Sequence, residues 1–316
     1  MPRPGLPTRK IGTTEVTAIG FGAMGLSVGY GTPPPDEERF KSEFRRFKRS
    51  GKRDDLFIAT KFGFFFQDGK VINGSPEYVH QALSRSLGRL GVDQIDLYYL
   101  HRPDVTVPIE HTIRAMAECV KAGKVKYLGL SECSSETLRR AHTVHPIAAV
   151  QVEYSPFTLD IEDDKINLLK TARELGVTII AYSPLGRGLL TGRYKGPQDL
   201  EDGDFRKEIP RYSEENFPNI LELVDGLKTI GERHNATAGQ ISLAWLLAQG
   251  PDIIPIPGTS KIKYLKENVG SLGIQLTQEE LLEVREVASK ADAAKGDRYP
   301  PSINGTLFAD TPELSE

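Results

Sequence analysis

Several short apolar runs of the chain end in polar side chains that could bind or transform a small molecule. Lys61 and His101 each follow directly on such a run. A Lys or His in this position can stabilise a developing negative charge or transfer a proton. Ser131 ends a further run, Gln151 lies in the run at 148–154, and both could hydrogen-bond a ligand. Any one of these residues alone is more often structural, so we base the prediction of a site on the whole set.

Two glycine-containing segments indicate further contacts with a ligand. The run at 16–22 leads into Gly22-Ala23-Met24, where small residues let a ligand approach the backbone. The segment Pro257-Gly258-Thr259-Ser260-Lys261 directly precedes an expected helix. A Gly-rich turn at a helix N-terminus, with a hydroxyl and a cation, is a suitable anion site.

These residues must be positioned by the elements around them, which alternate between strand and helix. Runs of five to seven apolar residues without strict alternation favour strands buried on both faces of a parallel sheet. The runs lie at 16–22, 56–60, 95–100, 127–131, 148–154, 178–184 and 252–258. Helices are expected at 75–90, after Ser75 as N-cap, and at 277–291, after the capping box of Thr277 and Glu280. This alternation predicts an α/β fold, a (β/α)8 TIM barrel with the site at the carboxyl ends of its strands.

The expected barrel is one strand short. The opening residues predict a small hairpin with a turn at Gly12–Thr14, flooring the barrel. Between the run at 16–22 and the run at 56–60 there is a Gly/Pro loop and a basic helical stretch, but no apolar run. One strand–helix unit of about 30 residues is therefore missing. We expect the chain to lack the second strand and its neighbouring helix.

Composition limits the class of protein. The chain has 316 residues and a net charge of −3, which gives no broad field to attract nucleic acid or anionic lipid. It has no continuous apolar run long enough for a membrane span and no secretory signal at its start. Two cysteines, Cys119 and Cys133, build neither a disulfide framework nor a metal cluster. We expect one barrel domain over 1–316, located in the cytoplasm, with no metal, nucleic-acid or membrane partner.

Two polar segments are expected to cover the mouth of the barrel. Residues 186–216 and the tail from Asp297 are rich in Gly, Pro and charged residues and contain no strand pattern. Long insertions after barrel strands commonly cover a bound ligand. We expect these segments to determine substrate choice, with cofactor affinity independent of the tail.

The residues named so far belong to longer blocks that resemble the aldo-keto reductases. Within that superfamily the chain looks like the fungal and plant NADP-dependent branch with pyridoxal-reductase-like and perakine-reductase-like members. The blocks span nearly the whole chain in order: IGFGAMGLS, GKRDDLFIATKFG, DLYYLHRPD, GKVKYLGLSECS, VQVEYSPF, AYSPLGRGLLTG, PIPGTSKIKYLKENVG and GDRYPPSINGTLFADTPEL.

The resemblance implies a catalytic tetrad of Asp, Tyr, Lys and His, of which this chain carries half. Lys61 and His101 match the Lys and the His, but the chain has no D-T-A-x-x-Y-G block to supply the other two. In relatives that block lies on the second strand and the loop after it, a segment that is missing here between Phe40 and Phe44. The missing strand and the missing half of the tetrad are thus one deletion. Tyr30 precedes a glycine as the catalytic Tyr does, but relatives carry a similar pair there in addition.

The cofactor residues implied by the resemblance are present, and they favour NADPH over NADH. Gly22, Ala23 and Met24 would approach the nicotinamide ribose, Ser131 and Gln151 the carboxamide, and Tyr182 the ring face. The remaining contacts would come from the loop over the pyrophosphate (Ser183, Pro184, Leu185, Gly186, Arg187, Gly188), the adenosine phosphate site (Gly258, Thr259, Ser260, Lys261) and the adenine site (Glu267, Asn268).

The resemblance therefore implies NADPH-dependent reduction of an aldehyde or ketone, a small-molecule carbonyl substrate, to an alcohol. The alternative is a catalytically dead member that binds NADPH and has a regulatory or structural role. A third possibility is an unstable product without a folded function. Because the Tyr proton donor and the Asp are missing, we expect the chain as written to have at most trace activity.

Overall fold

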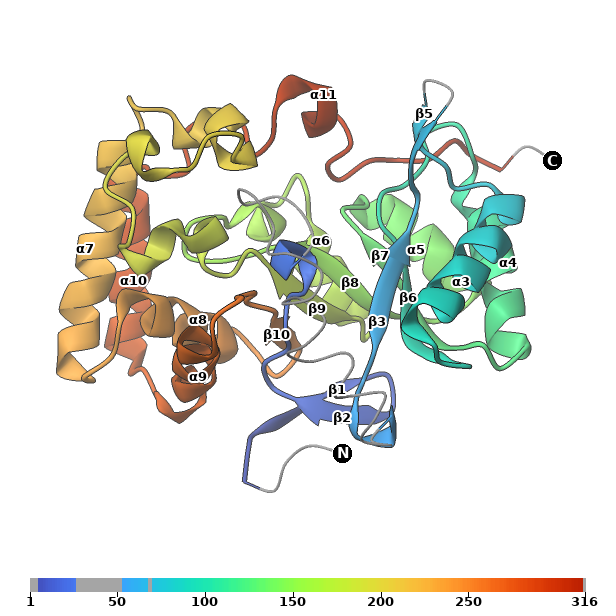
Figure 1. Ribbon diagram of the computed structural model, residues 1–316, viewed down its shortest axis with the longest axis horizontal. Helices are drawn as coiled ribbons and strands as arrows, with labels where there is room; N and C mark the ends of the chain where they lie inside the picture. The colour runs from blue at the N-terminus through green and yellow to red at the C-terminus, as the bar shows by residue number, and fades with distance from the viewer. Residues whose placement is uncertain (1–4, 27–52, 68–69, 315–316) are drawn as a thin grey trace.

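The computed structural model describes residues 5–26, 53–67 and 70–314. Within these residues a six-stranded parallel sheet forms the centre of the molecule, in the order β10-β9-β8-β7-β6-β3 (Figure 1). Its strands are β3 (Ala59–Phe62), β6 (Ile95–Leu100), β7 (Val125–Ser131), β8 (Ile147–Glu153), β9 (Thr178–Tyr182) and β10 (Ile253–Pro255). Six of the seven expected strands are confirmed.

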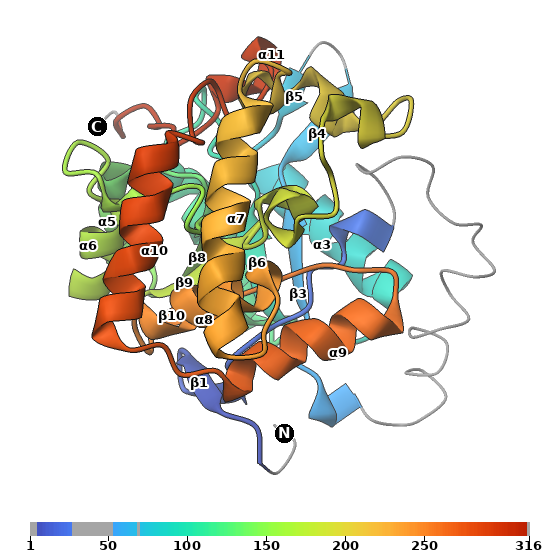
Figure 2. The same ribbon diagram turned by 90° about the vertical axis from the view of Figure 1, so that its left-hand side faces the viewer.

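Helices alternate with these strands and surround the sheet (Figures 1 and 2). An antiparallel pair, β4 (Phe64–Gln67) and β5 (Lys70–Ile72), separates β3 from the first of them. The helices are α3 (Pro76–Leu90), α4 (Ile109–Lys121), α5 (Ser135–Val144), α6 (Leu168–Glu174), α7 (Phe217–Arg233), α8 (Ala238–Ala248), α9 (Ile262–Gly270), α10 (Gln278–Ala291) and α11 (Pro301–Asn304). The fold is an α/β barrel, as expected.

The remaining expected run, at 16–22, begins in a hairpin and continues beside β10. The hairpin consists of β1 (Thr8–Ile11) and β2 (Thr14–Thr17), and its turn lies at Gly12, where φ is +56°. Residues 18–22 then run along β10, with Gly20 N donating to Pro255 O at 2.9 Å and Gly22 N to Pro257 O at 3.1 Å. Both the hairpin and its turn are as predicted.

One side of the barrel is open in the described part of the chain. There β3 pairs with β6 on one edge and has no strand partner on the other. Phe21 and Leu56, on the two sides of this opening, are 37% and 46% exposed. The basic stretch and Tyr30, which the sequence places between them, lie outside the described residues. The opening is where the sequence predicts a missing strand.

Two apolar layers hold the barrel together. The larger lies between the sheet and the helices. The smaller fills the interior and consists of Ile11, Leu97, Tyr99, Ala149, Ile180 and Ile254, so that the hairpin residue Ile11 closes the bottom of the barrel. A Cβ at Gly129 would lie 2.5 Å from the ring of Tyr99. Gly129 therefore leaves the space that this interior tyrosine occupies.

The two helix starts predicted from sequence are confirmed. Ser75 Oγ accepts a hydrogen bond from Tyr78 N at 3.4 Å at the start of α3. Thr277 and Glu280 form the reciprocal bonds of a capping box at the start of α10. Such caps satisfy backbone N–H groups that the first helical turn leaves free.

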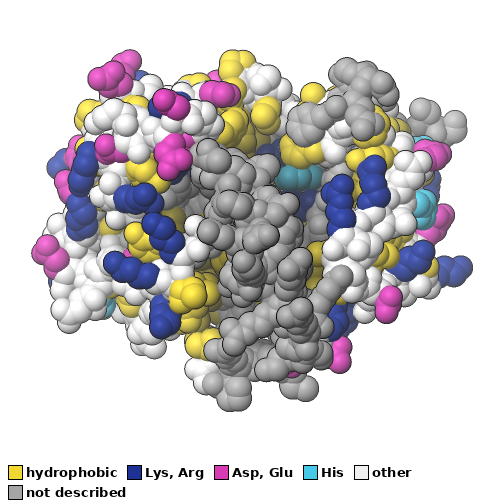
Figure 3. Space-filling model, in the orientation of Figure 1, with side chains coloured by type: hydrophobic (Ala, Val, Ile, Leu, Met, Phe, Trp, Pro, Cys, Tyr) yellow, Lys and Arg dark blue, Asp and Glu magenta, His cyan; other side chains and the backbone are white. Residues whose placement is uncertain are grey.

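The surface carries both signs of charge. Basic and acidic side chains lie interspersed over the face in Figure 3, in line with the net charge of −3. No helix in the described ranges has the length and apolar character needed to cross a membrane.

Candidate active site and cofactor site

A cavity of about 2550 Å³ extends along the open side of the barrel and over the carboxyl ends of the strands. Of the twenty site residues predicted from sequence, all except Gly186 line this one cavity. They are Gly22, Ala23, Met24, Lys61, His101, Ser131, Gln151, Tyr182, Ser183, Pro184, Leu185, Arg187, Gly188, Gly258, Thr259, Ser260, Lys261, Glu267 and Asn268. The structure therefore brings the predicted set together.

Lys61 lies on the edge strand β3, opposite Tyr99 of β6. Its ammonium donates a hydrogen bond to Gln151 Oε1. Burial, and secondly the nearby Arg102 guanidinium, lower the pKa of Lys61 to about 8. The side chain is thus mostly protonated at neutral pH and can lose its proton in mild base.

His101 follows β6 and is held next to Lys61. Its backbone N donates to Phe62 O at 2.7 Å, and Phe64 packs edge-on against its ring with 4.5 Å between the centroids. Burial lowers the pKa of His101 to about 2, with Lys61 and Arg102 contributing in the same direction. The imidazole is therefore neutral and can offer one hydrogen bond from N–H without carrying a charge.

Ser131 and Gln151, the predicted carboxamide contacts, are each bound by a cation. Arg102 Nη1 donates to Ser131 Oγ at 3.4 Å and to the backbone oxygen of His101 at 3.2 Å. Lys61 binds the carbonyl end of the Gln151 side chain, as described above. The Gln151 side chain also hydrogen-bonds Tyr99, and its amide nitrogen, with two N–H groups, can still donate to a ligand.

Gly22 and Gly258 are required for a reason that differs from the one expected. A Cβ at Gly22 would lie 2.5 Å from Ile256 O, and a Cβ at Gly258 would lie 2.5 Å from Gly22 O. The two glycines therefore let the segment 18–22 approach the chain after β10. The backbone approach that we assigned to a ligand is first an approach of these two segments of the chain.

The N-terminus of α9 is exposed beside the cavity. Lys261 precedes α9, and its backbone N donates to Thr259 Oγ1 at 3.0 Å. Ser260 and Lys261 are exposed, whereas Asn268 is buried. The carboxylate of Glu267 accepts a hydrogen bond from Thr237 Oγ1 at 2.8 Å. A helix N-terminus with an adjacent exposed cation is suited to a phosphate group.

The loop after β9 carries unusual backbone conformations. Ser183 and Arg187 have φ of +48° and +55°, a region that non-glycine residues seldom adopt. Gly186, with φ of +54°, is buried, and a Cβ there would lie 3.2 Å from Leu190 and Phe157. Its predicted contact with a pyrophosphate is therefore not supported by its position, and its role is to allow the turn.

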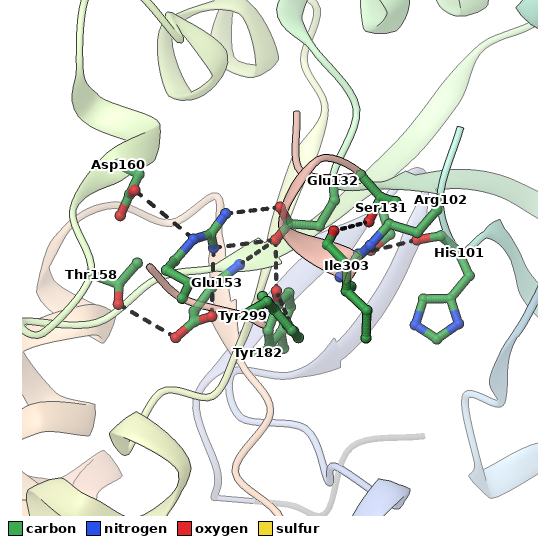
Figure 4. Close-up of polar contacts among 12 residues, drawn as sticks. His101, Arg102, Ser131, Glu132, Glu153, Thr158, Asp160, Tyr182, Tyr299 and Ile303 are labelled. Carbon is green, nitrogen blue, oxygen red and sulfur yellow. Dashed lines mark hydrogen bonds and ion pairs between the residues drawn. The ribbon is translucent and has the colours of Figure 1, made fainter. Parts of the chain in front are cut away.

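Four residues of this region were not among the predicted site residues: Arg102, Glu132, Arg298 and Tyr299. Arg102 and Tyr299 line the cavity, whereas Glu132 and Arg298 are buried and do not line it. Figure 4 labels Arg102, Glu132 and Tyr299. Glu132 follows directly on the predicted Ser131, and Arg298 and Tyr299 lie in the last matched block. Their position in matched blocks was a signal, but their mutual contacts depend on the fold.

Comparisons with known proteins agree with this arrangement. Residues 37–289 match the model of the aldo/keto reductase family. The chain is 56% identical over 340 residues to the aldo-keto reductase str7 of Strobilurus tenacellus, covering 98% of this chain and 99% of the relative. It is 47% identical over 339 residues to the aldo-keto reductase yakc [NADP(+)] of Schizosaccharomyces pombe, with the same coverage.

Solved structures show the same fold. The thermostable aldo-keto reductase Tm1743, crystallised with the inhibitor epalrestat, superposes with a TM-score of 0.70 at 27% identity, covering 89% of this chain and 100% of that one. The glycerol dehydrogenase AKR11B4 of Gluconobacter oxydans gives a TM-score of 0.79 at 24% identity, covering 90% of this chain and 95% of that one.

The alignments also bear on the missing strand. The comparison with the Strobilurus protein runs over 340 positions, whereas this chain has 316 residues, so at least 24 positions of the relative have no counterpart here. This is close to the strand–helix unit that the sequence pattern lacks. Despite that difference, the match to the family model and the similarity to both curated relatives extend over most of the chain. The chain belongs to the aldo/keto reductase family.

Proposed function

We propose that this chain binds NADPH and reduces the carbonyl group of an aldehyde or ketone to an alcohol, with Lys61 and His101 beside the reacting atoms. The observation that carries this proposal is the convergence of Lys61, His101, Ser131, Gln151 and Tyr182 on one cavity at the carboxyl ends of the strands. The name of the Schizosaccharomyces relative, which specifies NADP(+), supports the choice of cofactor.

The residues present fit an anionic dinucleotide. Arg187 lies in the loop assigned to the pyrophosphate, and its Nη1 is a buried donor without a hydrogen-bond partner in the described structure. Lys261 is exposed at the N-terminus of α9 and suits a 2′-phosphate. Gln151 and Ser131 would hold the carboxamide, and Tyr182 would pack against the ring. When bound, NADPH supplies the hydride.

The protein's own groups act on the carbonyl oxygen. The neutral imidazole of His101 would donate a hydrogen bond to it, and the ammonium of Lys61 would stabilise its growing negative charge and provide a proton. In the family a Tyr and an Asp complete this arrangement, and the block that carries them is missing from the sequence. We therefore expect turnover well below that of full-length relatives.

A Lys261→Ala variant tests the cofactor assignment. Losing a charged hydrogen bond to the 2′-phosphate would weaken NADPH binding by about 1.5–3 kcal/mol and leave NADH binding unchanged. Lys263→Ala, on the same helix but outside the cavity lining, is the matched control. Titration of both cofactors by fluorescence measures the difference. An unchanged NADPH preference in Lys261→Ala would refute the phosphate site.

The alternative of a catalytically dead NADPH-binding member is separated from this proposal by turnover. Both curated relatives are named as reductases, which favours the enzyme. Slow NADPH oxidation with an aromatic aldehyde, abolished in a Lys61→Met variant, would support the enzyme. NADPH binding with no oxidation above the rate without protein would support the alternative.

A further inference from the structure

The C-terminal tail places a buried guanidinium beneath the cavity. Arg298 is 4% exposed, and its Nη2 lies 3.0 Å from Glu132 Oε2. Its Nη1 lies 3.5 Å from Glu153 Oε2, and its Nε lies 3.9 Å from Asp160 Oδ1. One arginine of the tail thus contacts carboxylates that follow or end two neighbouring strands, β7 and β8. Figure 4 labels these carboxylates, Glu132 and Glu153.

Glu132 connects this arginine to Tyr182. The hydroxyl of Tyr182 donates to Glu132 Oε1 at 2.7 Å and lies 3.1 Å from the hydroxyl of Tyr299. Burial, and then the neighbouring Glu132, raise the pKa of Tyr182 well above its ordinary value, so the phenol remains a donor. The side chain that lines the cavity is therefore fixed at its far end by a carboxylate.

The carboxylate depends on its cations. Glu132 is completely buried, and its φ of +52° is one that the surrounding contacts must maintain. Burial alone would raise the pKa of Glu132, but Arg298 and Arg102 lower it below its ordinary value. The tail also binds the backbone here, since Ala309 N donates to Glu132 O at 3.2 Å. Without Arg298, Glu132 would lose the strongest of its charge partners.

We propose that Arg298 is a positioning residue that fixes the ring of Tyr182 through Glu132, so that the tail sets the affinity for the nicotinamide half of NADPH. This inference rests on the proposed function, because it takes Tyr182 as the surface on which the nicotinamide packs. It also revises the expectation from sequence that the tail affects substrate choice and leaves cofactor affinity unchanged.

Two buried arginines of similar exposure allow a matched experiment. Arg211 is 6% exposed and bonds to Gly296 O and Thr158 Oγ1, and it does not line the cavity. We compare Arg298→Met with Arg211→Met, so that each variant loses one buried guanidinium. Binding of NADPH and of adenosine 2′,5′-bisphosphate, which lacks the nicotinamide, is measured for each by calorimetry.

The expected result is selective. Arg298→Met weakens NADPH about tenfold and adenosine 2′,5′-bisphosphate less than about twofold, whereas Arg211→Met changes neither. Arg298→Lys, which keeps a charge, recovers part of the NADPH affinity. An equal loss for both ligands in Arg298→Met, or the same loss in Arg211→Met, shows a merely structural role and overturns the proposal.

Tyr182→Phe keeps the proposal testable if Arg298→Met does not fold. It retains the ring and removes the hydroxyl, so it should also weaken NADPH selectively. If the chain folds with both changes, the double variant should lose no more NADPH affinity than the single variant with the larger loss. The two losses do not add because Arg298 acts through Glu132 on Tyr182. If the unaltered chain binds NADPH no more tightly than adenosine 2′,5′-bisphosphate, the positioning role of Arg298 is refuted, whereas the proposed cofactor site is not. If it binds neither ligand, the proposed function fails first.

Discussion

The two sides of this barrel differ in how completely their strands are paired. On the closed side, β7, β8 and β9 each have a strand on both edges, and the helices α4, α5 and α6 pack against them. On the open side, β3 is paired with β6 alone among the described strands, and it carries Lys61. Ser131, Gln151 and Tyr182 all stand on the closed side. The residues proposed to hold the nicotinamide and the lysine proposed to supply the proton thus lie in different halves of the barrel.

Restoring the open side should have the largest effect. We expect that inserting the corresponding segment of the Strobilurus relative between Phe40 and Phe44 raises turnover about 10²–10⁴-fold, because it supplies the missing proton donor. It should also raise the free energy of unfolding by several kcal/mol, about 1–3 kcal/mol for each buried backbone group that gains a partner. Aldehyde reduction and thermal unfolding measure the two effects.

A Gly/Ser insertion of equal length is the control and should raise neither the turnover nor the free energy of unfolding. The comparison would fail if the chain as written already reduced an aromatic aldehyde as fast as its relatives. Another acid would then have taken the role, and Tyr30 would be the first residue to replace.

A pair of leucines tests the difference in packing. Leu130 on β7 is fully buried, whereas Leu56 beside the opening is 46% exposed. Leu130→Ala should lower the free energy of unfolding by about 2–5 kcal/mol, because it leaves a cavity in a closed core. Leu56→Ala should change it by less than about 0.5 kcal/mol. Urea unfolding measures both, and equal losses would contradict the assignment of an open side.

The pH dependence of turnover tests Lys61. Its pKa of about 8 in the folded protein means that the ammonium loses its proton as the pH rises through 8. Residual turnover should therefore fall about tenfold per pH unit above this value. In Lys61→Arg, whose guanidinium stays protonated, the fall should disappear even if the rate is low. A profile that is flat for the unaltered chain would exclude Lys61 as the proton source.

Two helix caps provide the smallest test. Thr277→Ala removes the cap of α10, which packs against α7 and α8, and Ser75→Ala removes the cap of α3, which packs against β3. Each should destabilise its helix by about 0.5–2 kcal/mol. We expect the global unfolding transition to record the change at Thr277, and local hydrogen exchange in α3 to record the change at Ser75. The same global effect from both would show that the two sides unfold as one unit.

Elements with a local pattern were predictable from sequence. The hairpin, the six strands and the capping box of Thr277 each depend on neighbours within a few residues. The cavity residues were found because strand ends meet at one mouth in a barrel. Arg298 and Glu132 are 166 positions apart in the sequence, and no local residue spacing predicts their contact. Likewise the close approach of Gly22 to Gly258 is visible only once the strands lie side by side.

The place of Arg298 in the chain has a consequence for the order of synthesis. Glu132 and Glu153 are synthesised before Arg298, so until it is made their cationic neighbours are Arg102 and Arg187. Each of these buried carboxylates then lacks one of its cations, which disfavours its burial. The sheet can form while translation continues, because domains fold from their N-terminal parts as they emerge. Arg298 is synthesised after every strand of the sheet, so a nascent chain halted before it should hold the sheet without the cation that supports Glu132 and Tyr182.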